Sequence, residues 1–387
     1  MKYASLDLIK MTAGEVVSLL KKNVVSPIEL LDALEQRINE VDKEVNSLPT
    51  LCFTRARSEA DKLMQKPIED RGILAGLPIA IKDLAPVKDV RSTWGSLIYK
   101  DFVPKRSDCL VENVETEGAI VYAKSNTPEF GAGANTFNEV FGATLNPWDT
   151  TKSCAGSSGG SAVALATGQA WIASGSDLGG SLRNPASFCS VVGLRPSPGR
   201  VAYGATGEGA FPADLFGIPG QPFSVAGPMA RNVSDVALLL DAMVGHHPRD
   251  PISLPRTTTS YIDAVKSRTK PKKVAFSRDL GVTPVDPAVA DICEKAAKRF
   301  EQLGCIVEEA HPDFSDVQDI FQTWRAMSFY VGKKSLLDTN KDLLKPEVVW
   351  NIEQAAEITV DDFARVELAR ARYLDRAVTF FEEYDLL

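Results

Sequence analysis

Gly156-Ser-Ser-Gly-Gly-Ser161 leads straight into the apolar segment Ser161-Ala-Val-Ala-Leu-Ala-Thr167, and this junction decides the fold of the chain. The turn is short and continues into a buried helix, so we expect an ordered turn instead of a flexible glycine-serine loop. A second glycine turn, Asp177-Leu-Gly-Gly-Ser181, places Ser181 24 positions after Ser157. The two turns are therefore the first candidates for functional segments.

Hydrophobic patterning on both sides of these turns predicts a mixed α/β fold. Short apolar runs at 73–81 and 119–124, bounded by glycine or polar residues, predict buried strands. Residues 273–277, 288–303 and 305–308 predict a strand, a helix and a strand in a βαβ-like unit. Capping signals and helical spacing predict further helices at 12–20, 26–38, 232–243, 317–337 and 360–382.

Composition and charge exclude several classes of protein. The 387 residues carry 43 basic and 51 acidic side chains, a formal net charge of −8 and no basic stripe, which argues against a nucleic-acid binder. No apolar run reaches signal-peptide or membrane-spanning length, and the six cysteines form no CxxC pair. We therefore expect a cytoplasmic protein with reduced thiols, no zinc site and no membrane association.

A serine nucleophile needs a base within reach, and this chain contains three histidines only. Lys82 follows the apolar residues 79–81, at the carboxyl end of a predicted strand, where open α/β sheets place their sites. A lysine whose pKa is lowered by burial can act as a base. The glycines before Ser181 allow backbone N–H groups to converge on an oxyanion. The ordinary alternatives are a capped turn for the serines and a lysine that reaches water.

At these residues the chain resembles the amidase signature family. The matching segments are Gly76-Leu-Pro-Ile-Ala-Ile-Lys-Asp83, Asn146-Pro-Trp-Asp149, Gly156-Ser-Ser-Gly-Gly-Ser161, Ser176-Asp-Leu-Gly-Gly-Ser-Leu-Arg183 and Gly193-Leu-Arg-Pro196. Their spacing matches too, and the resemblance is dense from about residue 70 to 245. Cys154-Ala155 departs from the glycine-containing pair that is usual in the family, at no catalytic position.

The resemblance implies a Ser-Ser-Lys amidohydrolase without metal or cofactor. Ser181 looks like the nucleophile, Ser157 like a bridging serine held by a cis peptide, and Lys82 like the base. The implied oxyanion hole consists of the backbone N–H groups of Leu178, Gly179, Gly180 and Ser181. Supporting polar roles fall to Ser158, Asp177 and Arg183. The candidate pocket residues are Phe130, Gly131 and Phe216.

The family resemblance also implies an architecture. We expect a single amidase domain, residues 1–387, with an α/β/α arrangement around a large, mixed, twisted sheet covered by helices. A helical segment of about 1–68 precedes a catalytic core of about 69–250. Residues 380–387 end just as an apolar strand begins, and family members continue past this point, so we expect the C-terminal part of the fold to be missing.

The expected activity is cleavage of carboxylic amide bonds, with aryl amides, carbamates or esters as candidate substrates because aromatic side chains lie near the matching segments. The expected partner is such a small molecule, with no nucleic acid and no membrane, and a homodimer is one candidate assembly. The family also contains the glutamine-hydrolysing A subunit of a tRNA-dependent amidotransferase complex. That protein carries Ser-Leu-Asp-Gln before Gly-Pro, whereas Gln221-Pro-Phe-Ser-Val-Ala-Gly-Pro228 stands here and favours a stand-alone hydrolase.

A serine hydrolase of another class is a further alternative. Gly156-Ser-Ser158-Gly-Gly160 also fits G-x-S-x-G, which would make Ser158 the nucleophile and His311 its base. That motif needs a hydrophobic strand before it, whereas Trp148-Asp-Thr-Thr-Lys-Ser-Cys154 is polar and turn-like. A non-catalytic binding protein on the same scaffold would not need the lysine and serine pair. The sequence therefore favours Ser181 as the nucleophile.

Overall fold

The computed structural model describes residues 4–387 apart from 205–209, 213–214 and 216–222. By its internal contacts the chain divides into two compact units. The first comprises Met1–Lys266 and Ser335–Val349, and the second comprises Ser267–Lys334 and Trp350–Leu387. The single domain expected from the sequence therefore stays a prediction.

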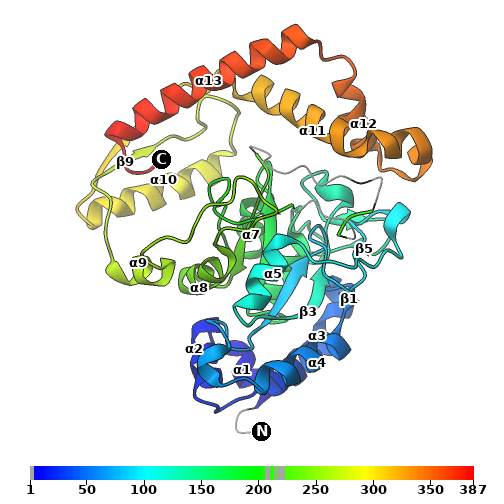
Figure 1. Ribbon diagram of the computed structural model, residues 1–387. Helices are drawn as coiled ribbons and strands as arrows, with labels where there is room; N and C mark the ends of the chain where they lie inside the picture. The colour runs from blue at the N-terminus through cyan, green and yellow to red at the C-terminus, as the bar shows by residue number, and fades with distance from the viewer. Residues whose placement is uncertain (1–3, 205–209, 213–214, 216–222) are drawn as a thin grey trace. The chain divides into compact units, whose positions relative to one another are not determined.

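The first unit is built around a mixed sheet, which has six strands among the described residues (Figure 1). The strand order is β1-β3-β2-β6-β8-β7. β2 lies between β3 and β6 and is parallel to both, whereas β1, β7 and β8 join through antiparallel pairs. The strands are Thr50–Leu51 (β1), Pro78–Lys82 (β2), Ile120–Ser125 (β3), Ile172–Asp177 (β6), Val192–Gly193 (β7) and Val225–Ala230 (β8). All residues of β2, β3, β6 and β8 are buried, so both faces of the sheet are covered.

β2 and β3 confirm the buried strands predicted at 73–81 and 119–124, but β2 is shorter than its apolar run. Ala75 and Gly76 have left-handed backbone conformations, with φ of 53° and 104°. Extended backbone cannot pass through such residues, so 73–76 form turns and the strand begins at Pro78. Lys82 still ends the strand, as the sequence predicts.

Helices cover this sheet (Figure 1). α6 (Gly159–Ala166) packs against β2, β3, β6 and β8, and α8 (Val233–Met243) packs against β6, β7 and β8. Both helices were predicted, and α6 begins two residues earlier than expected, inside the glycine turn. The other helices of this unit are α1 (Ser5–Lys10), α2 (Ala13–Lys21), α3 (Pro27–Val45), α4 (Phe53–Met64), α5 (Cys109–Thr116), α7 (Arg183–Cys189) and, except for its last residue, α9 (Tyr261–Ser267).

The N-terminal helices start at the capping boxes that the sequence predicts. Thr12 caps α2 and Ser26 caps α3, each together with a glutamate three residues later. The carboxylate of Asp235, in the first turn of α8, also accepts the backbone N–H groups of Ala13 and Gly14, at 2.9 and 3.0 Å. The start of α2 is therefore held by a residue that lies 222 positions farther along the chain than Ala13.

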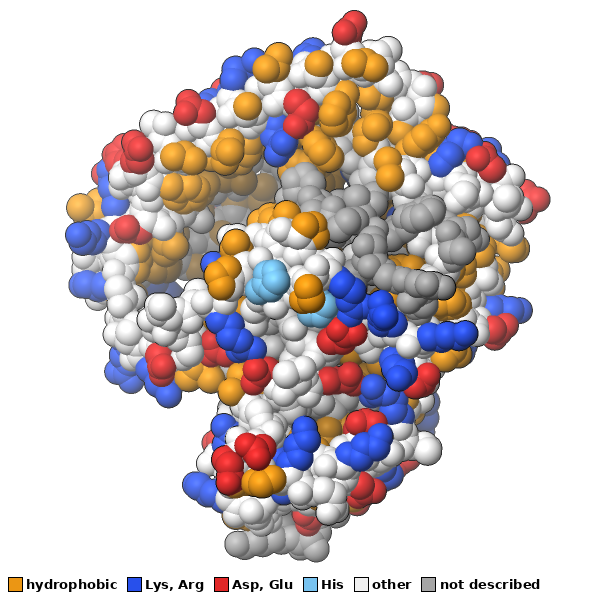
Figure 2. Space-filling view, viewed as in Figure 1, with side chains coloured by type: hydrophobic (Ala, Val, Ile, Leu, Met, Phe, Trp, Pro, Cys, Tyr) orange, Lys and Arg blue, Asp and Glu red, His pale blue; other side chains and the backbone are white. Residues whose placement is uncertain are grey.

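The second unit contains the predicted βαβ-like pair. β9 (Lys273–Phe276) and β10 (Ile306–Glu309) pair in parallel and are joined by α10 (Pro287–Gln302). α13 (Val360–Glu383) belongs to this unit, and α11 (Val317–Asn340) and α12 (Pro346–Ala355) have residues in both units. Large apolar side chains are exposed on α13, and Figure 2 shows orange side chains along the edge where Figure 1 draws this helix.

The last residues differ from the expectation of a new strand at 380. Residues 380–383 continue α13, and the ring of Phe380 stacks on that of Tyr384, the residue after the helix, with centroids separated by 4.6 Å. After the helix, Leu386 forms one parallel bridge with Val274 of β9. The expected strand is therefore reduced to this single bridge.

Candidate active site

Lys82 is the last residue of β2, and the neighbouring parallel strand β6 ends in Ser176 and Asp177. Parallel strands end at the same edge of a sheet, so these residues come together there. The Lys82 amide also donates to the Oγ atom of Ser174 at 3.0 Å. Lys82 is only 2% exposed. Of the two interpretations that the sequence left open, the buried lysine is therefore the one observed.

The Nζ atom of Lys82 lies within hydrogen-bonding distance of three serine hydroxyls. Ser157 is nearest at 2.7 Å, and Ser158 and Ser176 follow at 2.9 and 3.0 Å. Ser157 and Ser158 belong to the turn before α6, where the Gly156–Ser157 peptide bond is cis, as the family resemblance implied. The structure thus brings Lys82 and Ser157 together, as predicted.

Ser176 is a site residue that the sequence reasoning missed. Its signal was present in the sequence, since Ser174 and Ser176 are alternate residues of one buried strand. The Ser174 hydroxyl accepts the backbone N–H of Lys82, and the Ser176 hydroxyl lies near Lys82 Nζ at the end of the strand. Two hydroxyls at this spacing beside a buried lysine therefore indicate a polar cluster.

The environment of Lys82 favours its neutral form. Burial lowers the pKa of Lys82 to about 7, and the charge of Asp177 opposes this shift. Hydroxyl groups satisfy the hydrogen bonds of an ammonium group without neutralising its charge, so the cost of desolvation persists. Neutral and charged Lys82 therefore coexist near neutral pH, beside the Ser157 hydroxyl. This arrangement can take up and return a proton.

Ser181 lies in the turn between β6 and α7, at a partly exposed position. Its backbone carbonyl accepts the amide N–H of Ser158 at 3.2 Å, so the two glycine turns are joined directly. Gly180 has a φ of 104°, and a Cβ atom there would lie 2.7 Å from the Asn184 side chain. The turn therefore requires glycine immediately before Ser181.

The carboxylate of Asp177 holds this turn in place. It accepts the N–H groups of Gly180 at 2.8 Å and Leu182 at 3.1 Å. Arg183 donates to both carboxylate oxygens, each at 3.0 Å. Burial raises the pKa of Asp177, but Arg183 and the two amides outweigh this effect and hold the pKa below its ordinary value. Asp177 and Arg183 thus shape the turn, and their supporting role in catalysis stays a prediction.

The bond between Gly180 and Asp177 bears on the predicted oxyanion hole. Within the described part of the chain, the N–H groups of Leu178, Gly179 and Ser181 donate no hydrogen bond. Gly179 is exposed, and Leu178 and Ser181 are partly exposed. These three amides are therefore free to face a ligand, whereas the Gly180 amide faces Asp177. The four-donor oxyanion hole stays a prediction.

Arg195 is a second residue that the sequence reasoning left without a role. Its Nη1 donates to the backbone carbonyl of Asp177, and its Nη2 donates to the carbonyl of Phe223 at 2.8 Å. Arg195 thereby ties the end of β6 to the segment that enters β8. It stands inside the motif Gly193-Leu-Arg-Pro196, which was the available signal.

The opposite face of the sheet carries a buried ion pair. In the parallel register Lys124 lies beside Ile81 and Ser125 lies beside Lys82, so Lys124 and Lys82 point to opposite faces. The Nζ atom of Lys124 lies 2.9 Å from Oδ1 of Asp83, and both side chains are buried. Asp83 also accepts the hydroxyl of Thr93 at 2.6 Å. The residue that follows Lys82 is thus anchored independently of the serine cluster.

Aromatic side chains surround the segment that contains Phe130 and Gly131. The rings of Trp94, Tyr99, Phe102, Phe130 and Phe211 form a chain of contacts with centroid separations of 5.6 to 6.4 Å. A Cβ atom added to Gly131 would lie 3.4 Å from Ser157 Oγ. The predicted residues Phe130 and Gly131 therefore lie next to the lysine–serine cluster, and Phe216 lies outside the described residues.

The arrangement around Ser158 does not match a nucleophile elbow. The Ser158 hydroxyl contacts Lys82 Nζ and donates to the Ser176 carbonyl at 3.3 Å. Residues 146–158, all of them described, contain no strand, which such an elbow requires. The His311 ring stacks on Phe314 in the second unit, and its Nδ1 atom contacts the Pro312 carbonyl at 2.8 Å. The assignment of Ser158 and His311 as a catalytic pair gains no support.

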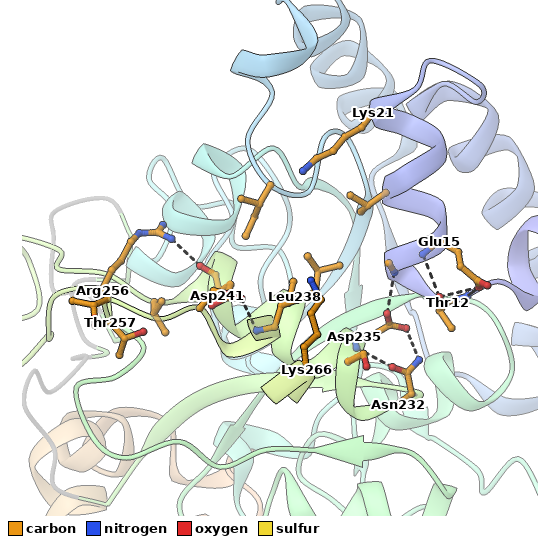
Figure 3. Close-up of a pocket in the computed structure, with 18 residues that line it drawn as sticks. Thr12, Glu15, Lys21, Asn232, Asp235, Leu238, Asp241, Arg256, Thr257 and Lys266 are labelled. Atoms are coloured by element: carbon orange, nitrogen blue, oxygen red, sulfur yellow. Dashed lines mark hydrogen bonds between the residues drawn. The ribbon is translucent and has the colours of Figure 1, made fainter. Parts of the chain in front are cut away.

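A separate cavity of about 930 Å³ lies between α2, α8 and the segment that carries Arg256 and Lys266 (Figure 3). Its carboxylates bind the protein's own backbone. Asp235 caps α2, and Asp241 accepts the first amides of α9, from Tyr261 at 2.8 Å and Ile262 at 3.1 Å. None of the predicted site residues that the structure describes lines this cavity.

The described residues contain no group of three histidine, cysteine or acidic side chains arranged to hold a metal ion. All six cysteines are free thiols. In the part of the chain that the structure covers, no helix combines the length and the apolar character needed to cross a bilayer.

Sequence comparison relates the chain to amide-cleaving enzymes. Residues 29–387 match the family model described as Amidase. The chain is 32% identical to the acylamidase of Rhodococcus erythropolis over 381 residues, which cover 97% of this chain and 78% of that enzyme. It is also 37% identical to the A subunit of the glutamyl-tRNA(Gln) amidotransferase of Desulforamulus reducens. This match extends over 316 residues and covers 80% of this chain and 63% of that relative. The chain thus spans less than two thirds of the amidotransferase relative.

Solved structures support the same relationship. A bacterial aryl acylamidase of the amidase signature family superimposes with a TM-score of 0.86 at 28% identity, covering 97% of this chain and 78% of that one. The 6-aminohexanoate cyclic dimer hydrolase in complex with its substrate gives a TM-score of 0.85 at 26% identity, covering 98% of this chain and 78% of that one. The expected mixed sheet covered by helices is confirmed.

Proposed function

Because the chain belongs to the Amidase family and is a hydrolase of amide bonds, we propose that it works through a Ser181 acyl-enzyme, with Ser157 and Lys82 as its proton relay. The observation that carries this proposal is the 2.7 Å contact between Ser157 and the buried amine of Lys82. A buried amine with a pKa of about 7 is matched to a base that works near neutral pH.

In the first half-reaction, neutral Lys82 takes the proton of Ser157, and Ser157 takes the proton of Ser181. The Ser181 oxygen forms a bond to the carbonyl carbon, and the carbonyl oxygen becomes an oxyanion. The free amides around Ser181 are suited to bind this charge, since a single such donor typically contributes ~10²–10³ in rate. As the carbon–nitrogen bond breaks, the leaving amine receives the proton from Lys82 through Ser157.

In the second half-reaction, water takes the place of the amine. The same relay removes a proton from water, and the resulting hydroxide attacks the acyl carbon. The proton then returns to the Ser181 oxygen as the acid leaves. Lys82 is neutral at the start and at the end, so one cycle consumes only the amide and one water molecule.

The substrate that we propose is an apolar or aryl amide, with carbamates and esters as related candidates. The ring cluster of Trp94, Tyr99, Phe102, Phe130 and Phe211 supports this choice, because it adjoins Gly131 and therefore Ser157. Aromatic rings in such clusters favour offset or edge-on contact with a further ring. The aryl acylamidase among the structural relatives is consistent with it.

Glutamine hydrolysis within an amidotransferase complex is the second candidate. It is favoured by the 37% identity to the amidotransferase relative. In that case the enzyme would release ammonia from glutamine and would need partner proteins for its whole activity. The segment 221–228, which departs from the pattern of that relative, favours the stand-alone hydrolase instead.

A labelling experiment and a substrate panel together test the proposal. The chain is treated with a fluorophosphonate, and the modified peptide is identified by mass spectrometry; we expect the label on Ser181 and none in Ser181→Ala. Label on Ser158 in the wild type would overturn the assignment. The panel comprises an aryl amide, a p-nitroanilide, an aryl carbamate, an aryl ester and glutamine, and ammonia release from glutamine alone would establish the second candidate.

A further inference from the structure

Lys345, from a distant segment, holds both ends of the turn that carries Phe130 and Gly131. The backbone N–H of Lys345 donates to Oε2 of Glu129 at 2.7 Å, and its Nζ atom donates to the carbonyl of Ala132 at 3.4 Å. Lys345 lies 216 positions after Glu129, in the segment that joins α11 to α12, and both residues belong to the first unit. Glu129 and Ala132 stand directly before and after the two predicted pocket residues.

The carboxylate of Glu129 joins this turn to a third segment. Glu129 is buried, and its Oε1 atom accepts the hydroxyl of Ser96 at 2.6 Å. The carbonyl of Trp94, two residues before Ser96, accepts the amide of Phe130 at 2.8 Å. Each oxygen of the carboxylate therefore has one donor, and Glu129 ties the loop that carries Trp94 to the segment that carries Lys345.

The backbone at Phe130 needs such support. Its φ is 50°, in the left-handed region, which a non-glycine residue keeps only where the surrounding contacts hold it. A cavity of about 370 Å³ lies beside the turn, and Glu129, Phe137 and Lys345 are among the residues that line it. Because this space is not filled by side chains, the turn has room to shift once its hydrogen bonds are lost.

We infer that Glu129 and Lys345 are positioning residues that hold Phe130 in the substrate site and thereby set the preference for an aryl group. The inference rests on the proposed function, in which the ring cluster is a wall of this site. The Phe130 ring meets Tyr99 edge-on, with centroids 6.2 Å apart, and such clusters favour contact with a further ring. The relay residues stand in other segments, so loss of the Glu129–Lys345 contact should leave them in place.

Two sulfonyl fluorides test the inference, one with a phenylmethyl group and one with a methyl group. Both react with the serine nucleophile, which forms a bond to sulfur while fluoride leaves, so the ratio of their inactivation rates reports the aryl part of the site. In Glu129→Ala we expect this ratio, phenylmethyl over methyl, to fall about tenfold, the size of one lost aromatic contact. An unchanged ratio, or an equal fall of both rates, overturns the inference.

Two further variants separate the hydrogen bond from general stability. Glu129→Gln keeps an acceptor oxygen for the Lys345 amide, and its NH₂ group faces Ser96, whose hydroxyl can turn to accept it, so it should restore most of the ratio. Asp235→Ala is the matched control, since Asp235 is a buried carboxylate that accepts backbone amides from a distant segment. It should lower stability and leave the ratio unchanged. A fall as large as in Glu129→Ala would overturn the inference.

The Lys345 amide offers a second test, which does not depend on the folding of Glu129→Ala. Lys345→Pro removes the N–H group, and the preceding Leu344, with φ of −89° and ψ of 140°, already has the backbone that proline requires before it. Lys345→Ala is the control, because it loses the side chain and keeps the N–H group. We expect a lower ratio in Lys345→Pro than in Lys345→Ala, and equal ratios once Glu129→Ala is added to each. Equal ratios without that addition would overturn the inference.

Peptide mass spectrometry of the sulfonylated protein distinguishes failure of this inference from failure of the proposed function. We expect the sulfonyl group on Ser181 with both reagents. A modified Ser181 together with an unchanged ratio in Glu129→Ala and Lys345→Pro overturns only the roles of Glu129 and Lys345. Absence of modification at Ser181 in the wild type overturns the proposed nucleophile.

Discussion

Lys124 and Asp83 form a buried ion pair with a 2.9 Å contact, on the face of the sheet opposite to Lys82. Asp83 directly follows the proposed base, so whatever fixes Asp83 also fixes the end of β2. Lys124 additionally donates to the Ala85 carbonyl at 2.8 Å and to the Ser92 hydroxyl at 2.9 Å. The pair therefore connects two parallel strands, β2 and β3, with the loop that follows β2.

Breaking this pair is expected to cost stability. Lys124→Met leaves the Asp83 carboxylate buried without its cation, and a change of this kind typically costs about 3–5 kcal/mol. Urea unfolding followed by circular dichroism measures the change in the free energy of unfolding. The double variant Asp83→Asn/Lys124→Met should recover part of the loss, because no unpaired charge remains. A double variant as unstable as the sum of both single variants would show that the two charges are not coupled.

The pH dependence of activity follows from the pKa of Lys82. The folded-state pKa of about 7 lies below the ordinary value for lysine, so raising the pH through 7 increases the neutral, active fraction. We expect kcat/KM to rise through an inflection near pH 7 and to reach an alkaline plateau. Lys82→Arg should lower the plateau by about a hundredfold or more, since arginine stays protonated. High activity of this variant would mean that residue 82 acts as a cation and not as a base.

Asp177→Asn should move the same inflection to lower pH. The negative charge of Asp177 raises the pKa of Lys82, so its removal lets burial lower that pKa further. The turn also loses its charged acceptor, and we expect a stability loss of about 1–3 kcal/mol. Arg183→Gln is the control, because it weakens the turn but keeps the Asp177 charge. An inflection that falls equally in both variants would contradict an electrostatic effect of Asp177.

Gly131→Ala tests the space beside Ser157. The added Cβ would lie 2.9 Å from Leu84 Cδ1 and 3.4 Å from Ser157 Oγ, at a φ of 71°. We expect kcat/KM for an aryl amide to fall by about tenfold or more, because the added methyl group would displace the substrate from its reactive position. Gly133→Ala is the matched control: its φ is 101°, but its nearest neighbour is Lys345 Nζ at 3.6 Å. Equal losses in both variants would point to backbone strain instead of blocked space.

The sequence predicted those parts of the site that lie within local motifs. Lys82, Ser157 and Ser181 each stand in a glycine- or proline-marked segment, and the helix after the first glycine turn follows from its apolar run. Ser176 and Arg195 were given no role, because their contacts join segments that are distant in the sequence. Ser176 and Lys82 meet because β2 and β6 pair in parallel and end at the same edge of the sheet.

In the fold, too, features set by local sequence were predicted better than the others. Helix starts with capping boxes were predicted correctly, because Thr12 and Ser26 act within one helical turn. The start of β2 was predicted too early, since hydrophobicity does not reveal the left-handed backbone of Ala75 and Gly76. The bond from the Gly180 amide to Asp177 could not be predicted, because a motif names which amides are near Ser181 but not where each points.

The cap that Asp235 places on α2 has a consequence for biosynthesis. Ala13 and Gly14 leave the ribosome more than two hundred residues before the carboxylate that binds their amides, and 222 positions separate Ala13 from Asp235. Arg231, which donates to the Ile9 carbonyl at 2.7 Å, is made equally late. In the nascent chain the amides of Ala13 and Gly14 and the carbonyl of Ile9 therefore lack these partners until α8 has been translated. A nascent chain stalled before residue 231 lacks both the arginine and the carboxylate that bind its first two helices.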